Sequence, residues 1–387
     1  MHLALNGWFW DQPFTGSGQY LRHLIKTLRR LYPDLTLTLI CPQSTALNDV
    51  PAGVNVVKVP VGKGQIGKVL FEQRAVPMET KRCGADLLHV PYWGAPLTSP
   101  APLVVTVHDV IPLSMREYQE TLSARLYFSL VRASAKGAGH LITDSEFSRR
   151  EIVEHIGVRP EAVTAIPLAC EESFHPKLGV ERDTDIRARY NLPEEGYVLY
   201  LGGFDVRKNL RALIAAWTFA APSVGDQYLL VLAGKPPQSW GSSRFPDIPK
   251  EIAARPGLEQ WIRWIGPVDE ADKPGVYRMA RCYVFPSRYE GFGLGPLEAM
   301  AAGTPVIAAD ASSLPEVTGD AAYLVDPNDS RQMGGAIIAT LIQDDLHASM
   351  RAAGLARATA FSWERTARET FAVYQQMLQG RSAISLT

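Results

Sequence analysis

The sequence predicts an α/β protein made of two doubly wound parallel sheets. Short apolar runs typical of buried strands alternate with helical segments along the whole chain. The 387 residues exceed what one hydrophobic core usually holds and suit two domains. Residues 170–183 lack periodicity and contain Pro176 and Gly179 among charges, so we expect the linker there. The predicted domains are therefore residues 1–172 and 173–362.

The composition is that of an ordinary globular protein. A formal net charge of −1 argues against a dedicated nucleic-acid-binding protein. The four cysteines are scattered without a C-x-x-C pair, so we expect free thiols in a reducing cytoplasm and no metal site. The chain shows neither a signal peptide nor a run of about 18 apolar residues. We therefore expect a cytoplasmic protein without a membrane span.

The first predicted strand, residues 2–6, leads to a glycine loop and then to a helix over residues 19–31. The loop contains Gly16 and Gly18 and is similar to a dinucleotide-binding fingerprint. Leu21 stands where the third glycine of that fingerprint belongs, which disfavours a dehydrogenase. An ordinary turn between a strand and a helix is the alternative.

The remainder of the first domain continues the alternation. The segment 67–83 combines basic residues with Val69, Leu70 and Phe71, and a break is expected near Pro77. Such a segment either lies on an anionic membrane or is a solvated helix over a sheet. The further strands are residues 35–40, 54–59, 86–90, 103–107, 140–143 and 163–167, and the further helices are residues 123–138 and a segment from 146 onward, which we expect Ser145 to cap.

Two histidines end predicted strands. His108 follows the strand at 103–107, and the carboxyl ends of strands in an open α/β sheet face the ligand crevice. His108 is therefore a candidate site residue, with a satisfied, partly buried histidine as the alternative. His89 is interpreted as structural or as part of the acceptor side.

The second domain begins with a strand at 197–201, followed by two cations, Arg207 and Lys208, before a helix from Leu210. Cations at such a helix start suit a diphosphate, although solvated surface cations are the ordinary alternative. The other strands are residues 229–233, 261–265, 282–285, 306–308 and 321–325, and the other helices are residues 271–280, 330–343, 345–360 and 363–380.

The segment 287–310 orders strand, glycine loop, helix and strand. Pro296 is expected to open the helix and Gly303 to cap it. Free N–H groups and the positive helix end then meet at one point, which suits a phosphate. Two carboxylates, Glu290 and Glu298, flank that point. Hydrogen bonding to sugar or ribose hydroxyls fits them better than acid–base chemistry, and solvated glutamates are the alternative.

This segment resembles the E-x7-E signature of the retaining glycosyltransferases of family 4. The spacing of Glu290 and Glu298, the sequence GFGL and the sequence EAMAAGTPVIA all agree. The resemblance covers nearly the whole chain and is strongest over residues 197–325. It implies the GT-B fold, in which two Rossmann-like domains face a central cleft. The last helix, residues 363–380, would return to the first domain.

The resemblance also implies roles for single residues. Glu290 would face the donor sugar, and Glu298 would hold the ribose hydroxyls. Many members carry an arginine where this chain has Gly203, and Arg207 would take its place. The diphosphate would contact Lys208, the amides of Gly293 and Leu294, and Gly16 and Gly18. The nucleobase would contact Val268, and the reacting sugar would contact His108.

The implied reaction is hexosyl transfer from a nucleotide-diphosphate sugar to a hydroxyl of a glycan or lipid-linked acceptor. It would retain the anomeric configuration and use neither a metal nor a cofactor. The sequences HDVIPL and RKN are similar to those of mannosyltransferases of bacterial polysaccharide assembly, so GDP-mannose is favoured over a UDP-sugar. A nucleotide-sugar epimerase, a sugar phosphorylase and a non-catalytic nucleotide-sugar-binding module are the alternatives. Stacking on an acceptor sugar, or simple packing, is expected of Trp8, Trp10, Tyr92 and Trp93.

Overall fold

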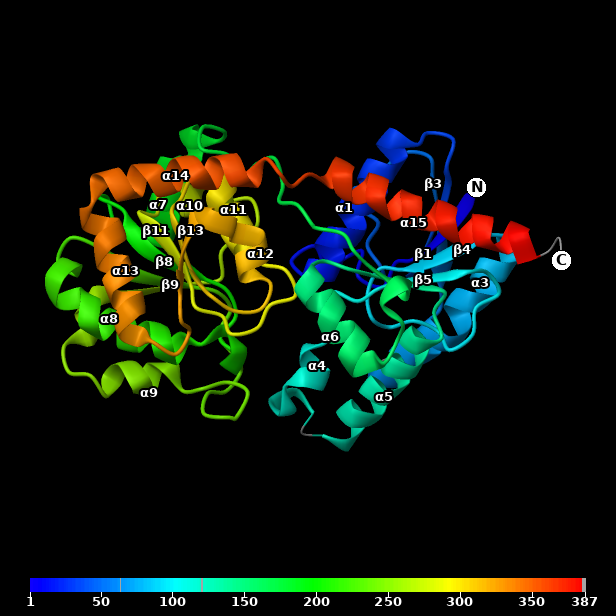
Figure 1. Cartoon of the computed structure of the whole chain (residues 1–387), viewed down its shortest axis with the longest axis horizontal. Helices are drawn as coiled ribbons and strands as arrows, with labels where there is room; N and C mark the ends of the chain where they lie inside the picture. Colours follow the sequence, from blue (N-terminus) through cyan, green and yellow to red (C-terminus); the bar gives the residue numbers. More distant parts are fainter. Residues whose placement is uncertain (63, 120, 385–387) are drawn as a thin grey trace. The chain divides into compact units, whose positions relative to one another are not determined.

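The computed structural model, which describes residues 1–62, 64–119 and 121–384, divides the chain into two compact units. Unit 1 combines Met1–Leu168 with Ser362–Thr387, and unit 2 is Ala169–Phe361. The division falls after residue 168, whereas the sequence analysis places it after residue 172. Each unit holds one parallel sheet between helices, which confirms the predicted fold class (Figure 1).

The sheet of unit 1 has seven strands in the order β3-β2-β1-β4-β5-β6-β7. Adjacent strands are parallel throughout, and the order reverses between β1 and β4. In such sheets the carboxyl ends near this reversal are the usual place for ligands. The strands are β1 His2–Asn6, β2 Thr36–Pro42, β3 Val54–Val59, β4 Leu87–Val90, β5 Leu103–Thr106, β6 His140–Thr143 and β7 Val163–Ala165.

The helices of unit 1 depart from prediction in several places: α1 begins at Gly16 rather than at residue 19, the short α4 was not expected, and the segment around Pro77 differs. The expected break near Pro77 is absent, because Pro77 lies in the first turn of a helix, where its missing N–H costs little. The irregularity instead precedes it, as a π-helical turn η1. The helices are α1 Gly16–Leu31, α2 Gly64–Leu70, η1 Phe71–Ala75, α3 Val76–Arg82, α4 Ile111–Ser114, α5 Leu122–Lys136, α6 Glu146–Ile156 and α15 Trp363–Ile384.

Helix α15 belongs to unit 1 although it follows unit 2 in the sequence. It packs on α1 and β6 (Figure 1). The ring of Phe371 stacks on Tyr32 with centroids 3.9 Å apart. Tyr374 places its hydroxyl 2.7 Å from Nδ1 of the buried His89. The other ring nitrogen of His89 lies 2.8 Å from Thr106 Oγ1. Burial lowers the pKa of His89 to about 3, so this histidine is a neutral structural group at physiological pH.

The sheet of unit 2 has six parallel strands in the order β10-β9-β8-β11-β12-β13. Its core includes Trp217 of helix α8, which is fully buried. Helix α8 packs on α13, where Gly334 leaves no room for a side chain because a Cβ would lie 2.8 Å from the carbonyl oxygen of Ala216. The strands are β8 Tyr197–Leu201, β9 Leu229–Ala233, β10 Ile262–Gly266, β11 Cys282–Phe285, β12 Val306–Ala309 and β13 Ala322–Val325. The helices are α7 Asp183–Tyr190, α8 Leu210–Val224, α9 Ile248–Ala253, α10 Lys273–Arg278, α11 Leu294–Ala302, α12 Leu314–Thr318, α13 Ser330–Ile342 and α14 Asp344–Ala358.

Helix α11 begins earlier than expected. Its first residue is Leu294, so Pro296 is the third helical residue rather than the opening one. The helix tolerates proline there because the N–H groups of its first turn have no partner within the helix. Gly303 ends the helix at φ 80°, which confirms the predicted cap. The early start leaves the N–H groups of Leu294 and Gly295 at the free end of the helix.

Within the described part of the chain, no helix combines the length and the apolar character needed to cross a bilayer.

Candidate functional site

In unit 1, His108 follows β5 and meets a carboxylate that follows the neighbouring strand β6. Its Nδ1 lies 2.8 Å from Oδ2 of Asp144, and both side chains are largely buried. Burial alone would lower the pKa of His108, but Asp144 and Asp109 offset this effect and raise it. Among the described residues, Nε2 of His108 has no hydrogen-bond partner. The ring is therefore held at Nδ1 by Asp144, and the backbone of Pro91 also acts on it.

Sequence analysis missed Asp144. The signal was present, because Asp144 follows β6 as His108 follows β5, and β5 and β6 are neighbours. The prediction for this position concerned the adjacent Ser145, which was expected to cap the following helix. A 3.0 Å hydrogen bond from the Ser148 N–H to Oγ of Ser145 confirms this cap.

Gly16 and Gly18, which were expected in a loop before the helix, lie in the first turn of α1, and their roles there are local. Gly18 donates its N–H to Oγ1 of Thr15 at 3.2 Å. A Cβ on Gly18 would lie 2.1 Å from the carbonyl oxygen of Gln12, so only glycine fits there. Gly16 is exposed, and a side chain there would meet open space. The phosphate contacts expected of Gly16 and Gly18 stay predictions.

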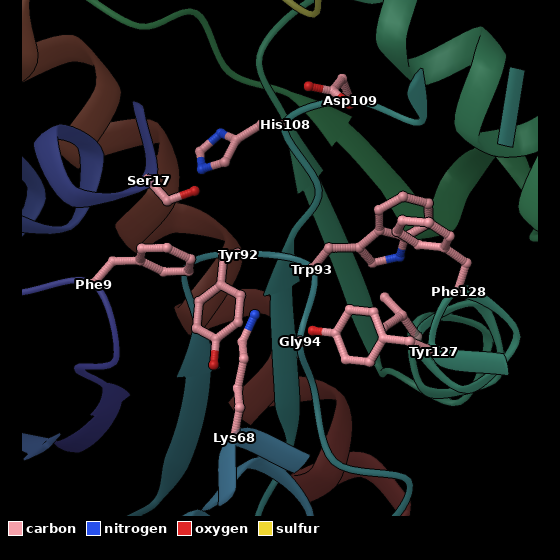
Figure 2. Close-up of a pocket in the computed structure, with 11 residues that line it drawn as sticks. Phe9, Ser17, Lys68, Tyr92, Trp93, Gly94, His108, Asp109, Tyr127 and Phe128 are labelled. Atoms are coloured by element: carbon pink, nitrogen blue, oxygen red, sulfur yellow. The ribbon is translucent and has the colours of Figure 1, made fainter. Parts of the chain in front are cut away.

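The four aromatic residues of interest differ in environment. Trp10 is fully buried and donates its indole N–H to the carbonyl oxygen of Asn48, so its role is packing. Tyr92 and Trp93 line a pocket, and Figure 2 shows them near His108. Trp8 is half-buried with its ring 5.3 Å from that of Phe71.

In unit 2, two loops from neighbouring strands meet. Arg207 and Lys208 lie in a short 3₁₀ turn, Val206–Lys208, after β8, and Glu290 lies in the loop after β11. Because the strands are parallel neighbours, both loops leave the same edge of the sheet. This brings Lys208 into contact with Glu290, although the two residues are 82 positions apart in the sequence.

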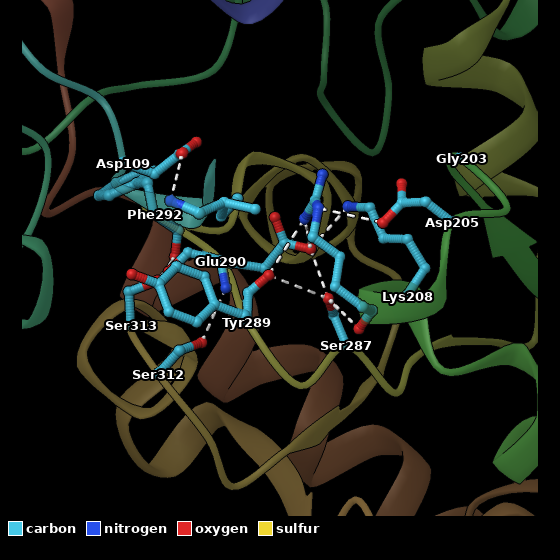
Figure 3. Close-up of polar contacts among 12 residues, drawn as sticks. Asp109, Gly203, Asp205, Lys208, Ser287, Tyr289, Glu290, Phe292, Ser312 and Ser313 are labelled. Atoms are coloured by element: carbon cyan, nitrogen blue, oxygen red, sulfur yellow. Dashed lines mark hydrogen bonds and ion pairs between the residues drawn. The ribbon is translucent and has the colours of Figure 1, made fainter. Parts of the chain in front are cut away.

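Three groups converge on one oxygen of Glu290. Its Oε1 lies 2.6 Å from Nζ of Lys208 and 2.7 Å from Nη1 of Arg207, and Oγ of Ser287 donates to it at 2.5 Å (Figure 3). Arg207 also contacts Oδ1 of Asp205 at 3.2 Å. Two cations and one carboxylate thus share a small, mostly buried space. This excludes the alternative that Arg207 and Lys208 are solvated surface residues. The contacts expected with the diphosphate and the donor sugar stay predictions.

Burial and charge act in opposite directions on this cluster. Burial would raise the pKa of Glu290, but Arg207 and Lys208 outweigh it and bring the pKa to about 2. For Lys208, burial lowers the pKa and Glu290 opposes the change. Glu290 is therefore ionised at any physiological pH.

Two serines hold the backbone around Glu290. The N–H of Glu290 donates to Oγ of Ser312 at 3.0 Å, and Ser313 donates its hydroxyl to the carbonyl oxygens of Glu290 and Phe292 at 2.9 and 2.5 Å (Figure 3). Sequence analysis missed these serines, because only the fold brings the segment after β12 beside the glycine loop. They fix the chain direction just before α11.

Gly293 precedes α11 with φ 127°, a conformation that disfavours residues with a side chain. A Cβ there would also lie 3.0 Å from Cδ2 of Leu314. The N–H groups of the first turn of α11 thus start from a tightly held loop. An anion at this end would meet the positive end of the helix dipole.

Glu298, inside α11, is 7% exposed, which excludes a solvated helix residue. The hydroxyl of Tyr277 donates to its Oε2 at 3.1 Å. Burial raises the pKa of Glu298 to about 7, and Lys273 opposes this rise. The two glutamates therefore differ in charge state although they belong to one short segment.

Two more expected residues lie at strand ends of unit 2. Val268 is half-buried beyond the end of β10. Gly203 follows β8, and its carbonyl oxygen accepts the hydroxyl of Tyr200. Arg207 lies further along the same loop and contacts Glu290, and its substitution for the arginine missing at Gly203 stays a prediction.

Comparison with known sequences identifies the chain. Residues 14–173 match the family described as Glycosyltransferase Family 4, and residues 182–357 match glycosyl transferases group 1. The O-antigen chain mannosyltransferase B of Escherichia coli is 35% identical over 272 residues, which are 70% of this chain and 70% of that protein. The chain belongs to glycosyltransferase family 4.

Solved structures agree on the fold of this glycosyltransferase. Sucrose-phosphate synthase from Thermosynechococcus elongatus has a TM-score of 0.73 at 24% identity, covering 98% of this chain and all of its own. Anabaena HepE in complex with UDP and glucose has a TM-score of 0.71 at 17% identity, covering 96% of this chain and 99% of its own. The fold is GT-B. Family membership favours glycosyl transfer over the epimerase, phosphorylase and non-catalytic alternatives.

The raised pKa of Glu298 predicts a pH effect on stability. In the unfolded chain its pKa is near 4.5 and in the folded chain about 7, so the folded state binds the proton more tightly between these values. The free energy of unfolding should therefore fall as pH rises through this window. Glu298→Gln, which resembles the neutral form, should be more stable than the wild type above pH 7, by up to about 3 kcal/mol.

Thermal unfolding of both proteins near pH 5 and near pH 8, compared through their midpoints, checks this prediction. The exposed Glu259→Gln is the matched control, and we expect it to behave as the wild type does at both pH values. Parallel shifts of the wild type and Glu298→Gln would contradict the assigned pKa.

Proposed function

We propose that this glycosyltransferase moves mannose from GDP-mannose to a hydroxyl of a glycan or lipid-linked acceptor and retains the anomeric configuration. The observation that carries the proposal is the convergence of Lys208 and Arg207 on Glu290 next to the start of α11. A sugar-diphosphate presents two features to such a site. Its anion suits the cations and the helix end, and its sugar hydroxyls suit the carboxylate.

The family relatives favour the mannosyl donor. The similar protein from Escherichia coli is named an O-antigen chain mannosyltransferase, and further mannosyltransferases from that organism are about 29% identical. The complex of HepE with UDP and glucose keeps a UDP-sugar as the alternative donor. We assign the donor to unit 2 and the acceptor to unit 1.

In the proposed reaction, the bond between the anomeric carbon and the diphosphate oxygen breaks, and its electron pair leaves with the diphosphate. Lys208 and Arg207 offset the charge that develops on this leaving group, and the amides of Gly293 and Leu294 add hydrogen bonds. The acceptor hydroxyl attacks the face from which the diphosphate departs. Its proton passes to the departing phosphate oxygen, so no protein nucleophile is required.

We further propose that the reaction needs neither a metal ion nor a cofactor, because the cations and helix amides supply the positive charge. Among the described residues, no group of three or more histidine, cysteine or acidic side chains is arranged to hold a metal. The polar groups beside α11 are suited to hydroxyls and phosphate rather than to a Mg²⁺ ion, which prefers several oxygen ligands.

The first test is transfer itself. The purified protein, given GDP-mannose and a mannose-terminated oligosaccharide, should release GDP and form a product with the anomeric configuration of the donor, as read by NMR. UDP-, ADP- and dTDP-sugars are the comparison donors. EDTA should leave the rate unchanged. Activity that EDTA abolishes and Mg²⁺ restores, or an inverted product, would refute the corresponding part of the proposal.

The second test separates the two glutamates. Glu298, if it holds the ribose hydroxyls, contributes binding that is equal in ground and transition states, so Glu298→Gln should raise the donor KM. Glu290 faces developing charge, so Glu290→Gln should lower kcat at saturating donor. Each effect should be about ten- to a hundredfold.

The control for this test is the exposed Glu259→Gln, which should keep both constants. A variant Glu298→Gln that loses turnover at saturation, together with a variant Glu290→Gln that changes only KM, would reverse the roles. If kcat and the donor KM are unchanged in both variants, the two glutamates do not belong to the active site.

We also propose that the enzyme works in the cytoplasm, at the inner face of the membrane. Ile66, Leu70 and Met78 of the segment 64–82 are exposed, at 76%, 56% and 55%, beside exposed Lys81 and Arg82. An apolar surface with basic neighbours suits an anionic lipid surface. The protein should float with vesicles that contain anionic lipid and less with Ile66→Ser. Equal flotation with neutral vesicles would contradict the proposal.

A further inference from the structure

Unit 1 contains a pocket of about 220 Å³ that the mechanism above does not use. Residues from α1, from α2, from the loops after β4 and β5, and from α5 line it. The lining includes Ser17, Lys68, Tyr92, Trp93, His108 and Tyr127 (Figure 2).

Lys68 brings a cation into this pocket and forms a long ion pair there. Its Nζ lies 3.7 Å from Oε1 of Glu72, which is longer than a hydrogen bond. Aromatic rings surround the ammonium instead, with Tyr127 at 5.3 Å, Tyr92 at 5.4 Å and Phe9 at 5.5 Å from their centroids. Cation–π contacts of this kind stabilise the charge but do not satisfy its N–H donors. A ligand oxygen would.

Glu72 is held in place from several sides. Its side chain is 1% exposed, and its Oε1 accepts hydrogen bonds from the hydroxyls of Tyr92 at 3.0 Å and of Tyr127 at 3.4 Å. A Cβ on Gly94 would lie 2.1 Å from this oxygen, so glycine is required there. Glu72 belongs to the π-helical turn η1, a feature that is frequent at functional sites.

Two other polar atoms of the wall are available to a ligand. Within the described part of the chain, Nε1 of Trp93 and Nε2 of His108 are buried and have no hydrogen-bond partner. The rings of Trp93 and Phe128 add apolar surface, with centroids 6.2 Å apart. A fitting ligand therefore carries several oxygen acceptors and an apolar face, as a sugar ring does.

Charge decides between a neutral and an anionic ligand. Lys68 and Glu72 together carry no net charge, and Glu72 is already buried. An anion bound at Lys68 would share the space with this carboxylate at high desolvation cost, whereas a hydroxyl would not. The pocket is also smaller than the roughly 300–1,000 Å³ of pockets for drug-sized ligands, so it suits a single ring.

We propose that this pocket binds one uncharged hexopyranose ring of the acceptor, with Lys68 donating to a ring hydroxyl and Trp93 and Phe128 packing on the ring. The inference rests on the proposed function and specifies its acceptor as a neutral sugar rather than a phosphorylated one. His108 lines the same pocket, so the bound ring lies beside the histidine that we assign to the reacting sugar.

The test uses the whole protein and two probes, methyl α-D-mannopyranoside and its 6-phosphate. Lys68→Met removes the donor and keeps the side-chain length, and Tyr127→Phe removes one hydroxyl while the ring stays. The exposed Lys26→Met is the matched control. Binding of each probe is measured by ligand-observed NMR, and transfer kinetics and donor hydrolysis without acceptor are measured in parallel.

We expect the wild type to bind the neutral probe more tightly than its phosphate. Lys68→Met should lower kcat/KM for the acceptor about ten- to a hundredfold and should weaken binding of the neutral probe by a similar factor. Tyr127→Phe should have a smaller effect in the same direction. The donor KM and donor hydrolysis should not change. The control should match the wild type in every measurement.

Two outcomes would overturn the inference while the proposed function stands. One is unchanged probe binding in Lys68→Met and Tyr127→Phe, and the other is tighter binding of the phosphate than of the neutral probe. A wild-type protein that neither transfers from nor hydrolyses any nucleotide sugar would overturn the proposed function instead. Probe binding would then still decide whether the pocket takes a neutral sugar.

Discussion

The parallel alignment of every strand pair is the constraint on which the rest of the structure depends. Parallel neighbours need a crossover connection, so helices cover both faces of each sheet, and all strands of a sheet end at the same edge. The residues of interest lie beyond these ends. His108 and Asp144 follow β5 and β6 in unit 1, and Lys208 and Glu290 follow β8 and β11 in unit 2. Their proximity within each unit is thus a property of the sheet.

The two glutamates of unit 2 illustrate how environment sets charge. Glu298 is buried and Glu290 is largely buried, yet the pKa of Glu290 is about 2 and that of Glu298 about 7. The difference arises because two cations touch Glu290 and outweigh its burial, while burial dominates at Glu298, where Lys273 and the hydroxyl of Tyr277 oppose it only in part. A single short segment therefore presents one permanent anion and one carboxyl that is close to its titration point.

Local features of the fold could be predicted from the sequence because their causes are local. Ser145 caps α6 through the N–H of Ser148, and Gly303 ends α11 in a left-handed conformation. The hydrophobic runs at residues 197–201 and 282–285 predicted both ends of β8 and β11 correctly. The start of α11 was wrong by two residues, because proline is tolerated at more than one position of a first turn.

The contacts of the candidate site could not be predicted in the same way. The bond between Lys208 and Glu290 joins residues 82 positions apart, and periodicity carries no information on such pairs. The same holds for Ser312 and Ser313 beside the glycine loop. The π-helical turn at Glu72 has no sequence signature of its own, because its residues are ordinary helix formers. The candidate residues could be named from the family resemblance, whereas the residues that they contact are known only from the structure.

Helix α15 has a consequence for how the protein is made. Residues of this helix leave the ribosome after all of unit 2, yet they complete unit 1 by covering α1 and by bonding the buried His89. Domains usually fold in order of synthesis. Unit 1 therefore lacks the cover of α15 until the residues that follow unit 2 have been made, and the apolar surface under this helix stays open to solvent until then.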